Sequence, residues 1–176
     1  ELEVGMNDRF DFAVYQVFSQ EPGGSLVHDG FKFRGRYRFG EPGQWWMDPL
    51  LYLEYKGASD LSGQAWEGKL ILAKDIGDFN LALNPTIEFE EEVGMDGERE
   101  WETEYEYSAG MSYRLHDLLR VGLEFKGSRE GNYIGPVISH GTPDLWVALG
   151  SAYRISAVEE DAPEFAVRLL LGVGIR

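Results

Sequence analysis

Cysteine is absent from the 176-residue chain, so the fold has neither a disulfide framework nor a cysteine-based zinc site. A basic surplus is absent too. The 31 acidic and 16 basic residues give a formal net charge of −15, whereas a nucleic-acid binder would normally be basic. No apolar run approaches the roughly 18 residues of a membrane-spanning helix, which excludes a helical membrane protein. A membrane barrel stays open, because its strands give a much weaker hydropathy signal.

The residues that are abundant favour β structure. Aromatic residues make up 14% of the chain and there are 22 glycines, a combination that suggests many strands joined by tight turns. With 43% hydrophobic and 27% charged residues, the chain does not have the composition of a disordered segment. Its length fits a single domain over residues 1–176.

The stretch FKFRGRYRF, residues 31–39, alternates strictly between two kinds of side chain. One parity carries the aromatic residues Phe31, Phe33, Tyr37 and Phe39, and the other carries the cations Lys32, Arg34, Arg36 and Arg38. Successive residues of a strand point to opposite faces, so one face would be aromatic and the other cationic. The same alternation recurs along most of the chain, and no comparable stretch has the 3.6-residue period of a helix.

This alternation predicts an all-β chain of eleven strands. They cover residues 1–6, 9–20, 29–39, 48–58, 65–75, 79–91, 99–114, 118–128, 132–140, 145–156 and 164–176. Tight connections such as residues 7–8 and 141–144 contrast with longer polar ones such as 21–30 and 57–64. Two populations of connection on alternate sides are typical of an outer-membrane barrel, which has short periplasmic turns and longer external loops.

Alternation alone leaves two solutions open: a soluble sandwich or lipocalin-like ligand binder with the apolar face inside, or a membrane barrel with that face outside. Three features favour the membrane. Many segments run 10 to 13 residues, aromatic residues gather near strand ends with aliphatic residues between them, and the polar face carries many small residues. Pro85 and Pro136 lie within predicted strands and lack a ladder donor, so we expect bulges or strand ends there.

The hairpin EVGMNDRFDFAVY and the closing segment FAVRLLLGVGI resemble small outer-membrane β-barrels of Gram-negative bacteria, of the porin-like class. The resemblance implies an antiparallel up-and-down transmembrane barrel in the cell outer membrane. Lipid and lipopolysaccharide would surround it, and protein partners in that membrane are a further expectation. Such barrels have even strand numbers. We therefore expect about 12 strands, with one before Glu1 missing from the eleven, or 10 strands if residues 1–6 do not span.

The polar parity supplies the candidate functional residues. The predicted lumen-lining set is Lys32, Arg34, Arg36, Arg38, Glu54, Lys56, Glu88, Glu102, Glu104, Glu106, Arg120 and Glu124. A cationic row at 32–38 facing an acidic row at 102–106 would set a transverse field and orient small polar solutes in a passive channel. Alternatively, ion pairs between adjacent strands would plug the lumen, and the protein would be a structural or partner-binding scaffold.

Catalysis has weaker support. The three histidines are His28, His116 and His140, and only His140 has a neighbouring nucleophile, Ser139. Adjacent residues on a strand point to opposite faces, so these two cannot serve one site without a bulge. No phosphate loop, calcium-binding loop or paired-histidine metal motif is present. We expect no enzyme, no catalytic residue, no metal ligand and no cofactor.

Overall fold

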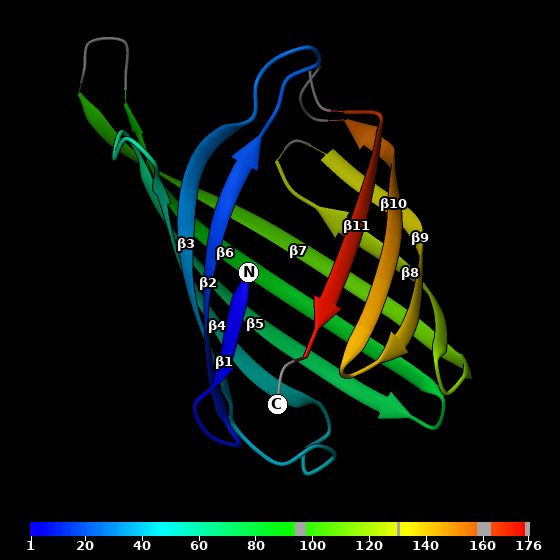
Figure 1. Cartoon of the computed structure of the whole chain (residues 1–176). Coiled ribbons are helices and arrows are strands. Elements are labelled where there is room, and N and C mark those ends of the chain that lie inside the picture. Colours follow the sequence, from blue (N-terminus) through cyan, green and yellow to red (C-terminus); the bar gives the residue numbers. More distant parts are fainter. Residues whose placement is uncertain (94–97, 130, 158–162, 175–176) are drawn as a thin grey trace. The chain divides into compact units, whose positions relative to one another are not determined.

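The structure is a computed structural model that describes residues 1–93, 98–129, 131–157 and 163–174. It forms one antiparallel sheet in which the strands lie in chain order (Figure 1). The strands are β1 (Leu2–Gly5), β2 (Phe10–Ser19), β3 (Val27–Arg38), β4 (Asp48–Ala58), β5 (Gln64–Ile76), β6 (Phe79–Val93), β7 (Arg99–His116), β8 (Leu119–Gly127), β9 (Gly131–Thr142), β10 (Leu145–Ala157) and β11 (Phe165–Val173).

The eleven predicted strands are confirmed, and most of their ends differ from the prediction by one or two residues. The antiparallel up-and-down order is confirmed as well, and the described residues contain no helix. The sheet is not closed in the described part of the chain, because β1 and β11 stand at its two ends. Closure into a barrel is therefore not part of the observed fold.

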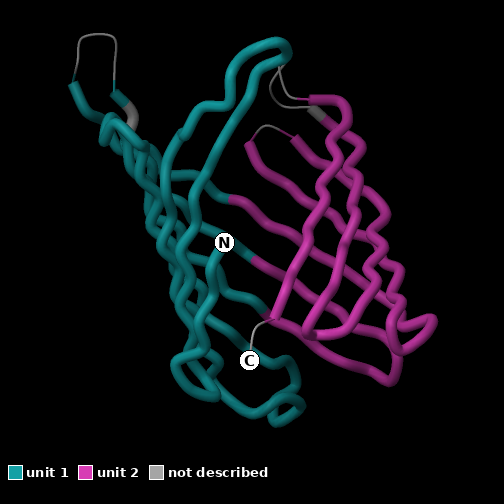
Figure 2. Tube along the Cα trace, viewed as in Figure 1, with its two compact units in different colours: residues 1–71, 85–105 teal, residues 72–84, 106–176 magenta. Residues whose placement is uncertain are grey.

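The chain divides into two compact units, drawn in different colours in Figure 2. Unit 1 holds residues 1–71 and 85–105, and unit 2 holds residues 72–84 and 106–176. Strands β1 to β4 belong to unit 1 and β8 to β11 to unit 2, while β5, β6 and β7 contribute to both.

Local chemistry explains the tight turns. Between β1 and β2, the Asn7 side-chain oxygen accepts hydrogen bonds from the backbone N–H groups of Arg9 and Phe10, both at 2.9 Å. This is the local capping that asparagine offers a turn. Where β9 leads toward β10, Gly141 has a φ of 134°, and a Cβ there would overlap the Leu145 carbonyl. Only glycine combines that dihedral angle with so close a backbone approach.

The two prolines do not end their strands, so that part of the expectation is wrong. Strand β6 continues past Pro85 to Val93, and β9 continues past Pro136 to Thr142. Pro136 pairs with Leu123 of β8, but the β9–β10 ladder skips Gly135 and Pro136 without a change of register. The missing N–H of the proline is thus accommodated by two absent ladder pairs, and the bulge in this hairpin lies at Arg154–Ser156 instead.

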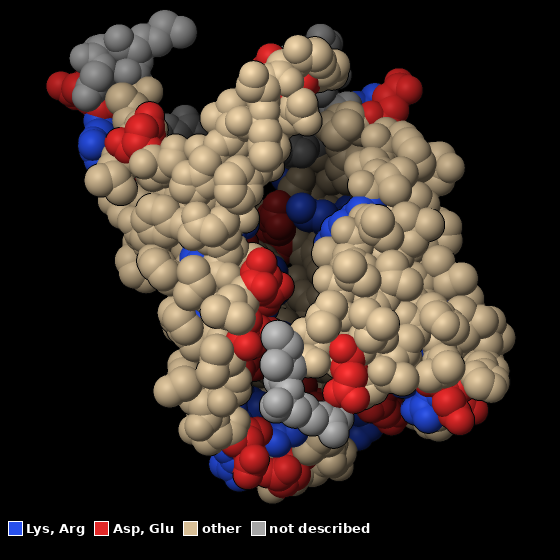
Figure 3. Space-filling model, viewed as in Figure 1, with Lys and Arg blue, Asp and Glu red and all other residues tan. Residues whose placement is uncertain are grey.

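Burial is inverted relative to a soluble protein. The buried hydrophobic residues of the described chain are only Ala13, Ala65 and Tyr133, whereas Arg34, Glu54, Glu67, Thr86 and Glu91 are all buried polar residues. Large apolar side chains on the other parity are exposed, for example Leu53 at 54% and Leu171 at 71%. We call the face that carries Arg34 and Glu54 the polar face, and the opposite one the apolar face. On the side drawn in Figure 3, the surface of β10 and β11 is nearly free of charge.

Candidate functional site: a charge network on the polar face

Arg34, at the centre of β3, is the most enclosed cation of the network, with 5% of its surface exposed. One guanidinium nitrogen donates to Glu1 Oε1 at 2.9 Å and to the Tyr15 hydroxyl at 2.6 Å. The other contacts a Glu3 carboxylate oxygen and lies 3.3 Å from Asp11 Oδ1. In the described residues, every acid that pairs with Arg34 therefore comes from β2, from β1 or from Glu1 directly before β1.

Arg36 lies two residues further along the same face and shares these acids. Its Nε donates to both oxygens of Asp11, at 2.8 and 3.0 Å, and its Nη2 donates to Glu3 at 2.8 Å. Glu3 and Asp11 thus each bridge Arg34 and Arg36. Arg34 and Arg36 are stable side by side because both meet Asp11 on the neighbouring strand β2 and Glu3 on β1.

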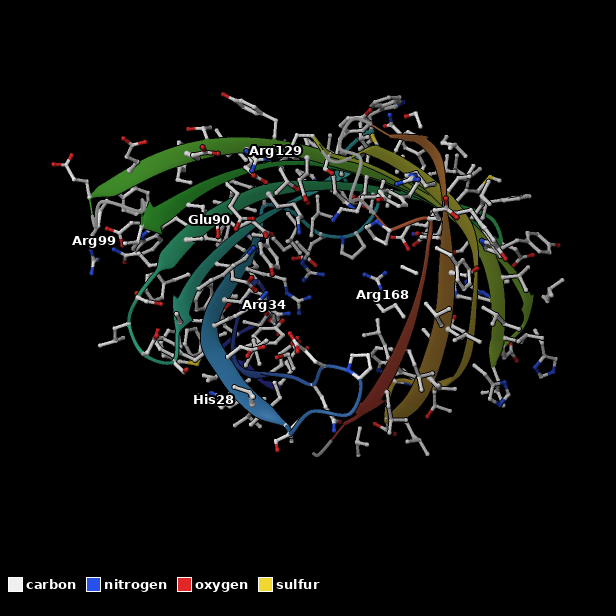
Figure 4. All side chains as sticks on the ribbon, turned by 90° about the horizontal axis from the view of Figure 1, so that it is seen from above. His28, Arg34, Glu90, Arg99, Arg129 and Arg168 are labelled. Carbon is white, nitrogen blue, oxygen red and sulfur yellow. The ribbon has the colours of Figure 1, made fainter. Side chains whose placement is uncertain are left out.

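The network continues across β4, β5 and β6. Lys32 lies 3.3 Å from the buried carboxylate of Glu54, which also accepts a 2.6 Å hydrogen bond from the Tyr52 hydroxyl. Lys56 bridges Glu67 at 3.0 Å and Glu88 at 2.8 Å, and Lys69 lies 2.8 Å from Glu67. In Figure 4, Arg34 lies on the concave side of β3, the side that carries this network.

Arg38 lies outside the chain of pairs. Its guanidinium donates to the Asp8 carbonyl at 2.7 Å and lies 3.6 Å from Glu41, in the loop after β3. It therefore fastens the β1–β2 turn to β3 and does not extend the ladder of ion pairs.

The acidic residues of β7 occupy the polar face as predicted by parity. Glu102, Glu104 and Glu106 are half-buried, and they alternate with exposed aromatic residues. Glu106 lies 3.3 Å from Lys126 of β8, within unit 2. In the described residues, Arg34 and Arg36 pair with Glu1, Glu3 and Asp11 and with none of these glutamates, so acids at the N-terminal end of the sheet neutralise the two arginines.

The last two predicted residues, Arg120 and Glu124, belong to the polar face of unit 2. Glu124 accepts from Arg168 of β11 at 3.2 and 3.4 Å. Arg120 lines a shallow hollow of about 230 Å³ whose floor is built from small residues of β6, β7 and β8, including Ala82, Gly110 and Gly122. The side chains on this part of the polar face are small, whereas those on the polar face of unit 1 are long and charged.

Sequence reasoning missed several members of the network. Glu1, Glu3 and Asp11 supply the acids for the arginines, and Glu67 joins two lysines. Parity alone was a usable signal for Asp11, since it belongs to the polar parity of β2 and stands opposite Arg36 in the β2–β3 ladder. Tyr15 and Tyr52 carry no charge, and their place in the network follows only from the structure.

The histidines remain apart from one another. His28 shares a 2.8 Å hydrogen bond with Gln16, and His116 accepts from the Leu118 backbone at 3.4 Å in its turn. On β9, Ser139 lines the polar-face hollow of unit 2, and the neighbouring His140 is exposed on the opposite parity. A Ser–His pair is therefore not assembled here.

Three further observations bear on function. Within the described ranges, no group of three or more His, Asp or Glu side chains is arranged to hold a metal ion. The same residues include no helix of the length and apolarity needed to cross a membrane. Comparison of the sequence with protein-family models and with curated proteins found no match.

Proposed function

We propose that the chain forms a transmembrane β-barrel of a Gram-negative outer membrane, and that its polar face lines a wet lumen through which small polar solutes pass passively. The observation that carries this proposal is the inverted burial. Arg34 and Glu54 are 5% and 4% exposed, while the apolar residues of the opposite parity meet the surroundings. Such a surface is stable against hydrocarbon and unfavourable against water. Large exposed apolar patches are rare on soluble monomers for the same reason.

The energetics agree with this orientation. An arginine or lysine on the lipid face costs about 2–4 kcal/mol near the bilayer midplane. The four cations of β3 all lie on the polar parity, and aliphatic residues such as Leu53, Leu83 and Leu149 are exposed on the other. A lipocalin-like binder would need those aliphatic residues to enclose a ligand cavity, and their exposure argues against it.

Aromatic pairs near the strand ends support the same orientation. Toward the short turns, Phe79 and Tyr113 have ring centroids 4.7 Å apart. Toward the longer loops, Tyr55 and Trp66 lie 4.8 Å apart. Amphipathic rings favour the two membrane interfaces, and aliphatic residues favour the core between them.

Strand direction bears on closure. Ten antiparallel steps separate β1 from β11, so the two strands run in the same direction. An antiparallel barrel needs an even number of strands. We propose a barrel of twelve strands, in which a further strand lies antiparallel to β11. A barrel of ten strands would need β11 to pair with β2, but that edge of β2 is already paired with β1 from Leu2 to Gly5. In lipid, the free edge of β11 would otherwise leave backbone groups unpaired.

A passage is favoured over a plug by the geometry of the polar face. The ion pairs of unit 1 run along the wall between neighbouring strands, and the wall of unit 2 is hollowed above small residues.

A structural or partner-binding scaffold is the second candidate. The observation that favours it is the density of pairing around Arg34 and Lys56, which is typical of small barrels with filled interiors. Lipid and lipopolysaccharide are the proposed surroundings in either case.

One preparation tests both candidates. The protein is folded into lipid, its heat-modifiable migration is measured on a gel, and its conductance is recorded in a planar bilayer. Heat-modifiable migration with stable conductance steps is the expected result. Migration without conductance overturns the passage in favour of the scaffold, and the absence of both overturns membrane residence.

A further inference from the structure

A second hollow lies on the polar face of unit 2, where β8, β9, β10 and β11 lie side by side. Its volume is about 260 Å³, and its lining includes Ala152 and Ala166 together with Glu124, Lys126, Tyr133 and Arg168. Pockets for drug-sized ligands occupy roughly 300–1,000 Å³, so this one suits a smaller molecule. Of the twelve residues predicted to line the lumen, only Glu124 lines this hollow.

Arg168 and Glu124, two charged residues of this lining, are only loosely engaged. Arg168 is well exposed, with 63% of its side-chain surface free, and one nitrogen meets Glu124 at 3.2 to 3.4 Å. In the described chain, its other guanidinium nitrogens have no hydrogen-bond partner. Figure 4 shows Arg168 pointing away from β11 on the concave side. A guanidinium with free donors is suited to hold a carboxylate through two parallel bonds.

Tyr133 adds a second, independent observation. Its side chain is 8% exposed, and its hydroxyl is buried without a hydrogen-bond partner in the described residues. Buried polar atoms are nearly always paired, so an orphaned hydroxyl in the lining of a hollow points to a missing ligand atom. Lys126, opposite Tyr133 in the ladder, also lines the hollow, and its ammonium group lies 3.3 Å from Glu106 of β7.

We propose that this hollow binds a small zwitterion of the amino-acid kind, with its carboxylate on Arg168 and its ammonium on Glu124. A ligand of one sign would meet a partner of opposite charge in only one member of the Arg168–Glu124 pair, whereas a zwitterion meets such a partner in both. The apolar lining from Ala152 and Ala166 accommodates a short aliphatic side chain. This inference rests on the proposed function, since it names the class of solute that the polar face would select.

The test uses the full chain folded in detergent micelles and titrated with L-alanine, with binding followed by saturation-transfer NMR. Acetate and ethylamine serve as single-charge probes. We expect alanine to bind saturably and more tightly than either probe. Arg168→Gln should weaken alanine binding about tenfold and Tyr133→Phe about threefold, as expected for a charge-assisted and a neutral hydrogen bond. Arg114→Gln is the matched control, because Arg114 pairs with Asp78 and does not line the hollow.

Each outcome decides something once heat-modifiable migration has verified folding. The inference is overturned if alanine gives no saturable signal, or if Arg168→Gln binds as the parent does. Acetate binding as tight as alanine binding, with Glu124→Gln unchanged, replaces the zwitterion site by a plain anion site and also overturns it. Conductance without alanine binding removes only this inference. Alanine binding without conductance removes only the proposed passage.

Discussion

Asp11 and Arg36 stand directly opposite each other in the β2–β3 ladder, and Arg36 Nε donates to both Asp11 oxygens at 2.8 and 3.0 Å. Neighbouring strands lie about 4.8 Å apart, so a long cation meets an acid on the next strand before it can reach across a lumen. The cationic row is therefore compensated locally. This local pairing weakens the transverse field that we expected between the cationic row at 32–38 and the acidic row at 102–106.

The first prediction concerns the orientation of the two faces. Phe33→Arg places a charge on the exposed apolar face, and we expect it to destabilise the protein in lipid by about 2–4 kcal/mol. Lys126→Gln, on the polar face of β8, removes a single 3.3 Å ion pair with the partly exposed Glu106 and should cost far less. Urea titration of the two variants in phospholipid vesicles measures the difference. Equal losses would contradict the assignment of the faces.

The second prediction concerns the centre of the charge network. Arg34→Ala removes the buried cation that pairs with Glu1, Glu3 and Asp11. Because these acids are partly exposed and Arg36 still pairs with Glu3 and Asp11, we expect a loss of about 1.5–3 kcal/mol, as for hydrogen bonds to a charged group. Arg9→Ala is the control, since Arg9 is exposed and lies 3.7 Å from Glu41. Surface pairs of that kind contribute about 0–1 kcal/mol. The free energy of unfolding of both variants checks this, and a loss for Arg34→Ala no larger than that of Arg9→Ala counts against the network.

The sequence predicted the strands well because alternation is a local signal that each segment carries by itself. Parity separated the two faces, with Lys32, Arg34 and Arg36 on one of them, but it did not decide which face is outside. That expectation came from the strand lengths, the aromatic residues near strand ends and the small residues of the polar face. The partners of those cations were harder to predict. Arg34 reaches Glu1 and Glu3 two strands away, and that reach depends on side-chain conformation. Pro136 was misread for a similar reason, since the ladder to β10 simply omits two pairs there.

The third prediction concerns the close approach of β9 and β10 beside Pro136. A Cβ at Gly135 would overlap the Ser151 carbonyl oxygen, so Gly135→Ala must push the two strands apart. Overpacking of this kind costs about 1–3 kcal/mol. Gly110→Ala is the control, because its nearest neighbour would be the Leu123 carbonyl oxygen at an ordinary 3.8 Å. Thermal unfolding in detergent compares them, and equal stability of the two variants rules out the tight contact.

The last prediction concerns ion selectivity. Arg36→Glu would set a third carboxylate beside Glu3 and Asp11, turning a compensated stretch of the polar face into a strongly negative one. We expect the passage to become more cation-selective, since a ring or row of carboxylates raises the local concentration of cations. The reversal potential in a planar bilayer under a KCl gradient measures the change, which should move toward the potassium equilibrium potential and shrink at high salt. Arg9→Glu, in the exposed connection between β1 and β2, should shift the potential much less. An unchanged reversal potential in a conducting Arg36→Glu protein would place this stretch of the network outside the ion path.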